Sequence, residues 1–263
     1  MWQSPYKVNT LRMNKKIRYD ELCLKVKEDY KKRDQCLQFK ETYLRWCEEC
    51  EEINLWTYWQ GRNCYSPKIM LVGQDWGSPW DKNAKSTMAQ IRLANEDKPY
   101  DYLNNNPSKT DANLIQLFSE IGYIDIMHPH KDLFFTNFVL GYRNRGCSGG
   151  YRKAWAEQDM AYFGELMEIL SPKVILCLGR ATFEAVLKAL SIRSAVRIGN
   201  YNQFITSDRN PVTISQDGSD TIHIFALAHC GALGTFNRNR SKGRLKDPLE
   251  IQRADWKRII PYL

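Results

Sequence analysis

Residues 68–77 have the sequence KIMLVGQDWG, in which an apolar run ends at a glycine and a carboxylate follows. The run Ile69–Val72 is short, apolar and partly β-branched, which predicts a buried strand. Asp75 therefore lies just past the C-terminal end of that strand, the edge at which open α/β sheets bind ligands. The stretch predicts the first strand of a sheet together with a candidate catalytic carboxylate.

The composition is that of a globular protein with a real core. The chain has 263 residues, of which 43% are apolar and 26% charged; this suits one large domain or two small ones. No apolar run approaches the ~20 residues of a bilayer span, and residues 1–16 lack the apolar centre of a signal peptide. We expect a cytoplasmic protein, or a nuclear one in a eukaryote, that is monomeric and has no membrane partner.

Three further stretches resemble the first strand, and helical patterns separate them. The predicted strands after the first are residues 134–140, 174–178 and 222–228. The predicted helices are residues 111–122, 155–170, 181–190 and the tail 248–263, and residues 194–220 form turns and a hairpin-like excursion. This alternation predicts the α/β class, as a three-layer α/β/α sandwich around a mainly parallel four-stranded sheet.

The N-terminal part has a different character. Residues 17–52 are charge-rich with recurring apolar side chains, and the spacing of Leu37, Tyr43, Leu44 and Cys47 predicts a helical hairpin or a long helix. We therefore divide the chain into a helical N-terminal extension packed on the core, residues 1–60, and an α/β domain, residues 61–263.

The positive charge is unevenly distributed. The net charge is +8, and residues 133–156 and 221–246 contain basic side chains but no acidic ones. The basic residues of these two stretches are Arg143, Arg145, Arg152, Lys153, Arg238, Arg240, Lys242, Arg244 and Lys246. Because both stretches begin with a predicted strand, they would form a positive rim suited to phosphates. The simpler interpretation is two solvated basic loops.

Three polar residues fall at strand ends: Asp75, Asn137 and His229. A carboxylate can orient and activate water, an amide matches the edge of a pyrimidine-like base, and a histidine can stabilise negative charge on a leaving group. Together they suit hydrolysis of an N-glycosidic bond. Taken singly, each has a structural explanation: a helix cap for Asp75, a satisfied buried amide for Asn137 and an ordinary core or surface histidine for His229.

Four motifs carry a family resemblance. They are Gly73-Gln74-Asp75, residues 135–140 (FTNFVL), residues 172–180 (PKVILCLGR) and residues 229–233 (HCGAL). In this order and spacing, over roughly residues 65–245, the chain resembles the uracil-DNA glycosylase superfamily. The resemblance implies a nucleoid-associated or nuclear DNA repair glycosylase that excises a flipped uracil or another deaminated or mismatched base.

The resemblance also implies roles for residues. Asp75 would position water or stabilise the sugar cation, and His229 would bond the base carbonyl oxygen. The residues expected to bind the substrate are Gly73, Gln74, Trp76 and Asn137. The residues expected to bind DNA are Leu233, as a wedge in the vacated stack, and Arg238, Arg240, Arg143 and Arg145, on phosphates.

Two departures from the family leave alternatives open. Trp76-Gly77 replaces the Pro-Tyr-His of many uracil-specific members, so a mismatch or a deaminated purine is also a candidate substrate. His229-Cys230-Gly231 replaces the usual His-Pro-Ser, which motivates a second hypothesis, a catalytically inactive DNA-binding protein on the same fold. A small-molecule nucleotide hydrolase is a third, against which the basic stretches argue.

We expect no cofactor. Some superfamily members hold an iron–sulfur cluster on four cysteines, but here only Cys47 and Cys50 resemble part of that pattern. Zinc on Cys36, Cys47, Cys50 and Cys64 is conceivable from the CxxC spacing, and plain core packing is the alternative. Reduced thiols are expected for the eight cysteines of a cytosolic protein.

Overall fold

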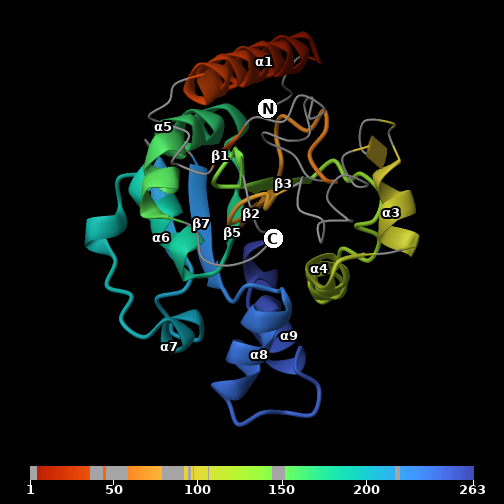
Figure 1. The fold of residues 1–263 in the computed structure, drawn as a ribbon, viewed down its shortest axis with the longest axis vertical. Coiled ribbons are helices and arrows are strands. Elements are labelled where there is room, and N and C mark those ends of the chain that lie inside the picture. The colour runs from red at the N-terminus through yellow and green to blue at the C-terminus, as the bar shows by residue number, and fades with distance from the viewer. Residues whose placement is uncertain are drawn as a thin grey trace.

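The computed structural model describes residues 5–35, 44–45, 59–78, 92–93, 96, 98–105, 107–143, 152–216 and 220–263. The fold is α/β, as predicted, with a mainly parallel sheet between layers of helices (Figure 1). Within the described residues this sheet has five strands in the order β3-β2-β5-β7-β6. They are β2 (Ile69–Gly73), β3 (Leu133–Asn137), β5 (Val174–Leu178), β6 (Val212–Gln216) and β7 (Asp220–Leu227).

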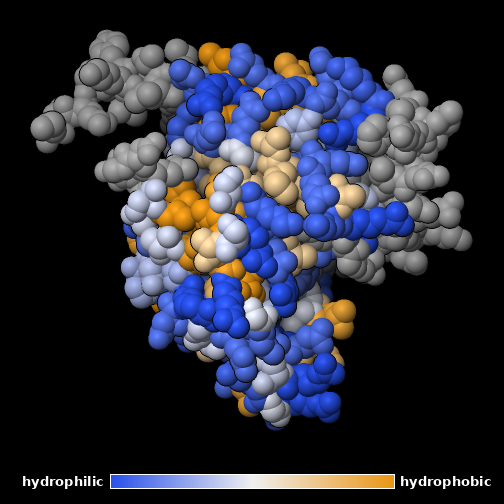
Figure 2. Space-filling model, turned by 90° about the vertical axis from the view of Figure 1, so that its left-hand side faces the viewer, coloured by the Kyte–Doolittle hydropathy of each residue, from blue (hydrophilic) through white to orange (hydrophobic). Residues whose placement is uncertain are grey.

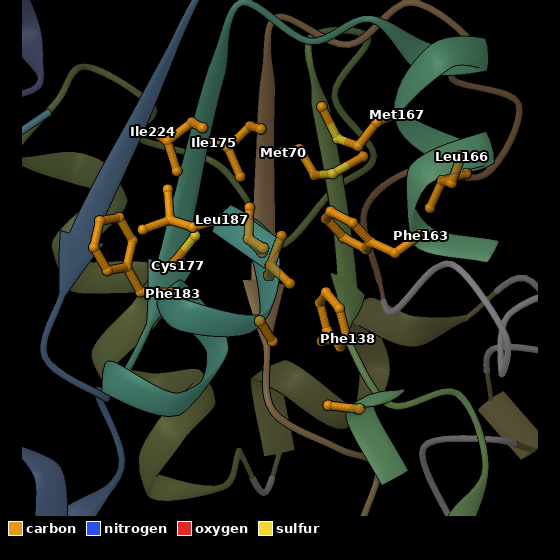
Figure 3. Close-up of a cluster of buried hydrophobic side chains, with 14 of the residues drawn as sticks. Met70, Phe138, Phe163, Leu166, Met167, Ile175, Cys177, Phe183, Leu187 and Ile224 are labelled. Atoms are coloured by element: carbon orange, nitrogen blue, oxygen red, sulfur yellow. The ribbon is translucent and has the colours of Figure 1, made fainter. Parts of the chain in front are cut away.

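The central strands β2 and β5 are buried at every position, which explains why they are apolar throughout rather than alternating. Met70 and Val72 point into a core shared with α1 (Pro5–Gln35), α5 (Lys153–Leu170) and α6 (Arg180–Ala189). Figure 3 shows this core, with Met70 and Ile175 of the sheet facing the helix side chains. Ile69 and Leu71 point into a second core, shared with α4 (Lys109–Ser119) and α9 (Glu250–Lys257).

The fifth strand is the main addition to the predicted sheet. The predicted hairpin-like excursion contains the 3₁₀ turn η3 (Arg193–Ala195), α7 (Tyr201–Ile205) and β6, which pairs antiparallel with β7 at the sheet edge. The predicted strand 134–140 ends earlier, at Asn137. Beyond that residue the chain follows the loop after β2, because Phe138 N donates to Gly73 O (3.0 Å) and Val139 N donates to Gln74 O (3.1 Å).

The N-terminal helix packs on the same core as the sheet. Tyr19, Leu22, Val26 and Tyr30 recur at helical spacing and are buried against it. The helical prediction is wrong at Leu44, because β1 (Leu44–Arg45) pairs antiparallel with β4 (Tyr142–Arg143). Pairing with a distant segment overrides the local pattern there. Leu37, Tyr43 and Cys47 lie outside the described residues.

The remaining elements are α3 (Pro99–Asn105), α8 (Ala232–Arg240) and η4 (Ile260–Tyr262). Helix α8 occupies part of what the sequence predicted to be a basic loop after His229. Among the described helices, none is long and apolar enough to cross a membrane.

Candidate active site

The C-terminal edge of the sheet gathers the three predicted polar side chains. Gly73 and Asn137 face each other in the β2–β3 register, Asp75 follows β2, and His229 follows β7. A Cβ on Gly179, just after β5, would lie 3.9 Å from Cβ of His229. Asp75 is also near enough for its charge to raise the pKa of His229. The sheet order therefore brings these groups to one site.

Gly73 makes room for the Asn137 carboxamide. A Cβ at residue 73 would lie 2.1 Å from Asn137 Oδ1, so a side chain there would displace the amide. Within the described part of the chain, no hydrogen bond uses the amide group of Asn137. A half-buried amide with a free donor and a free acceptor is able to read the edge of a ligand.

Asp75 is held by a buried arginine. Arg143 Nε lies 2.8 Å from Asp75 Oδ1 and Nη2 lies 2.7 Å from Oδ2, and each side chain is only 7% exposed. Gln74 Nε2 donates to Oδ2 (2.8 Å) and Gly77 N donates to Oδ1 (3.0 Å). Since these bonds occupy both oxygens, the carboxylate is better suited to act through its charge than to accept a proton.

This pair corrects the sequence-based role of Arg143. It was expected on the exposed phosphate-binding rim, but β4 lies beside the loop after β2, where Arg143 N donates to Gly77 O (2.8 Å). Its guanidinium lies over the ring of Trp155, 5.4 Å from the centroid. A buried charge requires a counter-charge, so Arg143 belongs to the candidate active site and not to an exposed basic rim.

The His229 ring has a defined tautomer. Gly231 N donates to His229 Nδ1 at 2.9 Å, so the proton of the neutral ring resides on Nε2. Burial lowers the pKa of His229, and Asp75 raises it by a smaller amount. A Cβ on Gly231 would lie 3.0 Å from Nδ1 and Cε1 of the ring, so the turn depends on glycine. The histidine is thus a neutral donor at pH 7.

A buried polar network holds the backbone of the His229 turn. Gln252 Nε2 donates to the carbonyl oxygens of Ala228 (3.1 Å) and His229 (3.2 Å). The Thr235 hydroxyl donates to Gln252 Oε1 (2.8 Å), and Asn113 Nδ2 donates to Cys230 O (2.6 Å). Gln252, Thr235 and Asn113 are not among the residues predicted from the sequence. The signal that could have found them is a polar side chain on the apolar face of a helix.

Arg238 also departs from its predicted role. Its side chain is fully buried, with Nε 2.7 Å from Asp255 Oδ2 and Nη2 2.6 Å from Oδ1. The pair fastens α8 to α9, so Arg238 does not reach a DNA phosphate. The helical periodicity of α8 turns this residue inward, whereas Asn237 and Arg240 face solvent.

The outer face of α8 carries an exposed stripe. Leu233 is 73% exposed and Phe236 51% exposed, and Arg240 lies one turn further with its guanidinium 6.0 Å from the Phe236 ring centroid. Leu233 and Arg240 are among the residues predicted from the sequence, whereas Phe236 is not. Its spacing of three residues from Leu233 becomes a signal once the segment is recognised as a helix.

The loop after α8 extends this face with positive charge. Arg240, Lys242, Arg244 and Lys246 are exposed, and none pairs with an acidic residue in the described ranges. Asn239 fixes the loop, because its carboxamide donates to Leu245 O (2.9 Å) and accepts from Leu245 N (2.8 Å). Helix α8 and this loop lie at the lower end of the molecule in Figure 1, and Figure 2 shows that end as mainly hydrophilic, with isolated apolar residues. We name the Leu233–Phe236–Arg240 stripe and this loop the α8 surface.

Other predicted residues have plainer surroundings. Trp76 is half-buried, with its ring centroid 6.4 Å from that of Tyr142. Cys64 is buried, and its thiol donates to Lys131 O (3.1 Å). Arg145, Cys36, Cys47 and Cys50 lie outside the described residues. Among those described, no three His, Cys, Asp or Glu side chains group as metal ligands would.

Comparison with known protein-family models gave no match, and neither did comparison with curated proteins. The function therefore has to be argued from the geometry and chemistry of the site.

Proposed function

We propose that the protein is a DNA glycosylase that hydrolyses the N-glycosidic bond of a flipped uracil or of another deaminated or mismatched base. The proposal rests on one juxtaposition. A free Asn137 carboxamide, the fixed Asp75 carboxylate and the neutral His229 imidazole lie at one edge of the sheet. Each group suits one requirement of this reaction.

The chemistry follows from these three groups. Asn137 donates to and accepts from the edge of the flipped base. As the C1′–N bond breaks, its electron pair leaves with the base, and the Nε2 proton of His229 hydrogen-bonds the base carbonyl oxygen, where negative charge grows. The sugar becomes positive and is stabilised by Asp75. Water then adds to C1′ and releases a proton to solvent, and the departing base anion takes up a proton, leaving an abasic site and the neutral free base.

The α8 surface supports a nucleic-acid substrate. Leu233 and Phe236 are apolar side chains of the size that other proteins insert between or against unstacked bases. Arg240 and the cations of the following loop would bind the phosphates beside them. A small neutral substrate would need neither feature.

The test is abasic-site formation by the wild-type chain. Labelled duplexes carrying U·G, U·A, T·G, hypoxanthine or xanthine are incubated with the protein and cleaved with alkali, and the undamaged duplex is the control. We expect cleavage at the lesion in at least one duplex. Absence of abasic sites on every duplex would contradict the proposal.

The second candidate is a DNA-binding protein that lacks catalysis. It is favoured by the occupation of both Asp75 oxygens by Arg143, Gln74 and Gly77. Tight, salt-sensitive binding to the same duplexes without turnover would support it over the glycosylase.

Two arginines of α8 make a matched pair of variants. We expect Arg238→Met to lower the free energy of unfolding by about 3–5 kcal/mol, because it leaves Asp255 buried without its counter-charge. Arg240→Met should leave stability within about 0.5 kcal/mol and weaken duplex binding, with a shallower dependence of affinity on salt. Urea unfolding and fluorescence anisotropy measure the two effects. A stable Arg238→Met variant with reduced affinity would contradict the assignment.

A further inference from the structure

In the segment between Asn137 and Arg143, the backbone hydrogen bonds to the neighbouring segment are interrupted. The chain here runs beside the end of β2 and the loop after it, and Phe138, Val139 and Arg143 donate backbone hydrogen bonds to them. The N–H groups of the intervening Leu140 and Gly141 do not bond to that neighbouring segment and donate to side chains instead. The chain therefore bends at residues 140–141, just before the arginine that binds Asp75.

Two buried side chains receive the diverted N–H groups. Leu140 N donates to Asp159 Oδ2 (2.8 Å), and Gly141 N donates to the Tyr30 hydroxyl oxygen (3.1 Å). The Tyr30 hydroxyl in turn donates to Asp159 Oδ2 (2.7 Å). Tyr30 is 1% exposed and Asp159 0%. Since buried N–H groups require partners, this pair determines where the bend can form.

The close approach of Tyr30 to the bend requires a glycine at position 141. A Cβ at this position would lie 2.3 Å from Cε1 of Tyr30, so the backbone passes directly against the tyrosine ring. Arg33, one turn further along α1, lies over the Tyr30 ring, with its guanidinium 5.0 Å from the ring centroid. The bend is thus enclosed by α1 and α5.

We propose that Tyr30, together with Asp159, is a positioning residue for the candidate active site. The pair fixes the bend at Leu140–Gly141, and the bend directs Arg143 onto Asp75. The N-terminal helix is then a component of the site and not an accessory to the α/β core. The catalytic meaning of this inference rests on the proposed glycosylase function, whereas its structural content does not.

Tyr30→Phe tests the inference, with Tyr162→Phe as the matched control. Phenylalanine keeps the packing of either ring and removes one hydroxyl. The Tyr162 hydroxyl donates to Asp29 in the same α1–α5 interface, and among the described residues it has no hydrogen bond to Leu140 or Gly141. Tyr30→Phe should lose more stability than Tyr162→Phe, because it leaves the buried Gly141 N–H without its partner, whereas Asp29 is 36% exposed. Readouts local to the bend therefore separate the two variants.

The measurements are amide hydrogen exchange at Leu140 and Gly141, the NMR resonance of the Arg143 Nε–H group, and excision kinetics. For Tyr30→Phe we expect about tenfold faster exchange at Gly141, a shifted Arg143 resonance, and a kcat lowered about tenfold with KM unchanged. Tyr162→Phe should change none of these.

Equal behaviour of the two variants in exchange and in the Arg143 resonance would overturn the inference. These two readouts need no enzymatic activity, so they decide it even if no duplex is cleaved. Failure of the glycosylase proposal is seen separately, in the wild-type assay.

Discussion

His229→Ala is expected to lower the single-turnover rate of base excision by about 10²–10³-fold, and to change the free energy of unfolding by about 1 kcal/mol or less. The imidazole Nε2–H group is the donor available to a base carbonyl oxygen as negative charge develops there. The fold loses little, because the turn is held mainly through its backbone by Gln252 and Asn113. Rates are measured on whichever duplex the wild type cleaves.

The control for this variant is His128→Ala. His128 lies in a loop, with a side chain that is 54% exposed and a weak contact to Asp125. Its removal should leave the excision rate unchanged. A loss of less than about fivefold for His229→Ala would remove this histidine from the chemistry.

The pH dependence of excision follows from the protonation state of His229. Burial lowers the pKa of His229 from its ordinary value near 6.5, so the ring is neutral from about pH 7 upward and the rate should be level there. As the pH falls through this lowered pKa, Nδ1 gains a proton and opposes Gly231 N–H, so the rate should fall. Because the unfolded chain binds this proton more readily, stability is also lost in the acid direction.

Arg143→Ala is expected to lower the free energy of unfolding by about 3–5 kcal/mol and to reduce excision about 100-fold or more. The variant leaves the Asp75 carboxylate buried without its bidentate partner and free to turn. Urea unfolding gives the first effect and single-turnover excision the second. Arg197→Ala, at an exposed arginine between η3 and α7, is the control and should change neither.

A double-mutant cycle separates the energy of the Asp75–Arg143 ion pair from the effect of removing either side chain alone. Asp75→Ala/Arg143→Ala should be less destabilised than the sum of its single variants, by about 1–3 kcal/mol, because neither charge is then left alone. Additivity within about 0.5 kcal/mol would show that the two side chains do not stabilise each other.

The sheet was predictable because its signal is local. The runs 69–72 and 174–178 are apolar at every position, since both faces of the sheet are covered by helices, and no distant residue is needed to interpret them. The convergence of Asp75, Asn137 and His229 required one further rule: carboxyl ends of parallel strands share an edge. Strand β6 was harder, because an edge strand is only half-buried and its pattern is weak.

The orientation of the arginines was not predictable from the sequence. Arg143 and Arg238 stand in stretches without acidic residues, which favoured an exposed basic rim. Their partners come from elsewhere: Asp75 is 68 residues from Arg143 and Asp255 is 17 from Arg238. A count of nearby charges cannot detect such pairs, because burial and pairing depend on which segments fold together.

The sequence by itself determined the α/β class, the strand order along the chain, and the polar residues that end the strands, because short-range hydrophobic patterns encode them. Only the tertiary structure decided which charges face solvent and which are buried in pairs. It likewise placed the Tyr30 hydroxyl, from the N-terminal helix, against the backbone N–H of Gly141, two residues before Arg143. These features depend on contacts between segments distant in sequence, and such contacts leave no periodicity in the sequence itself.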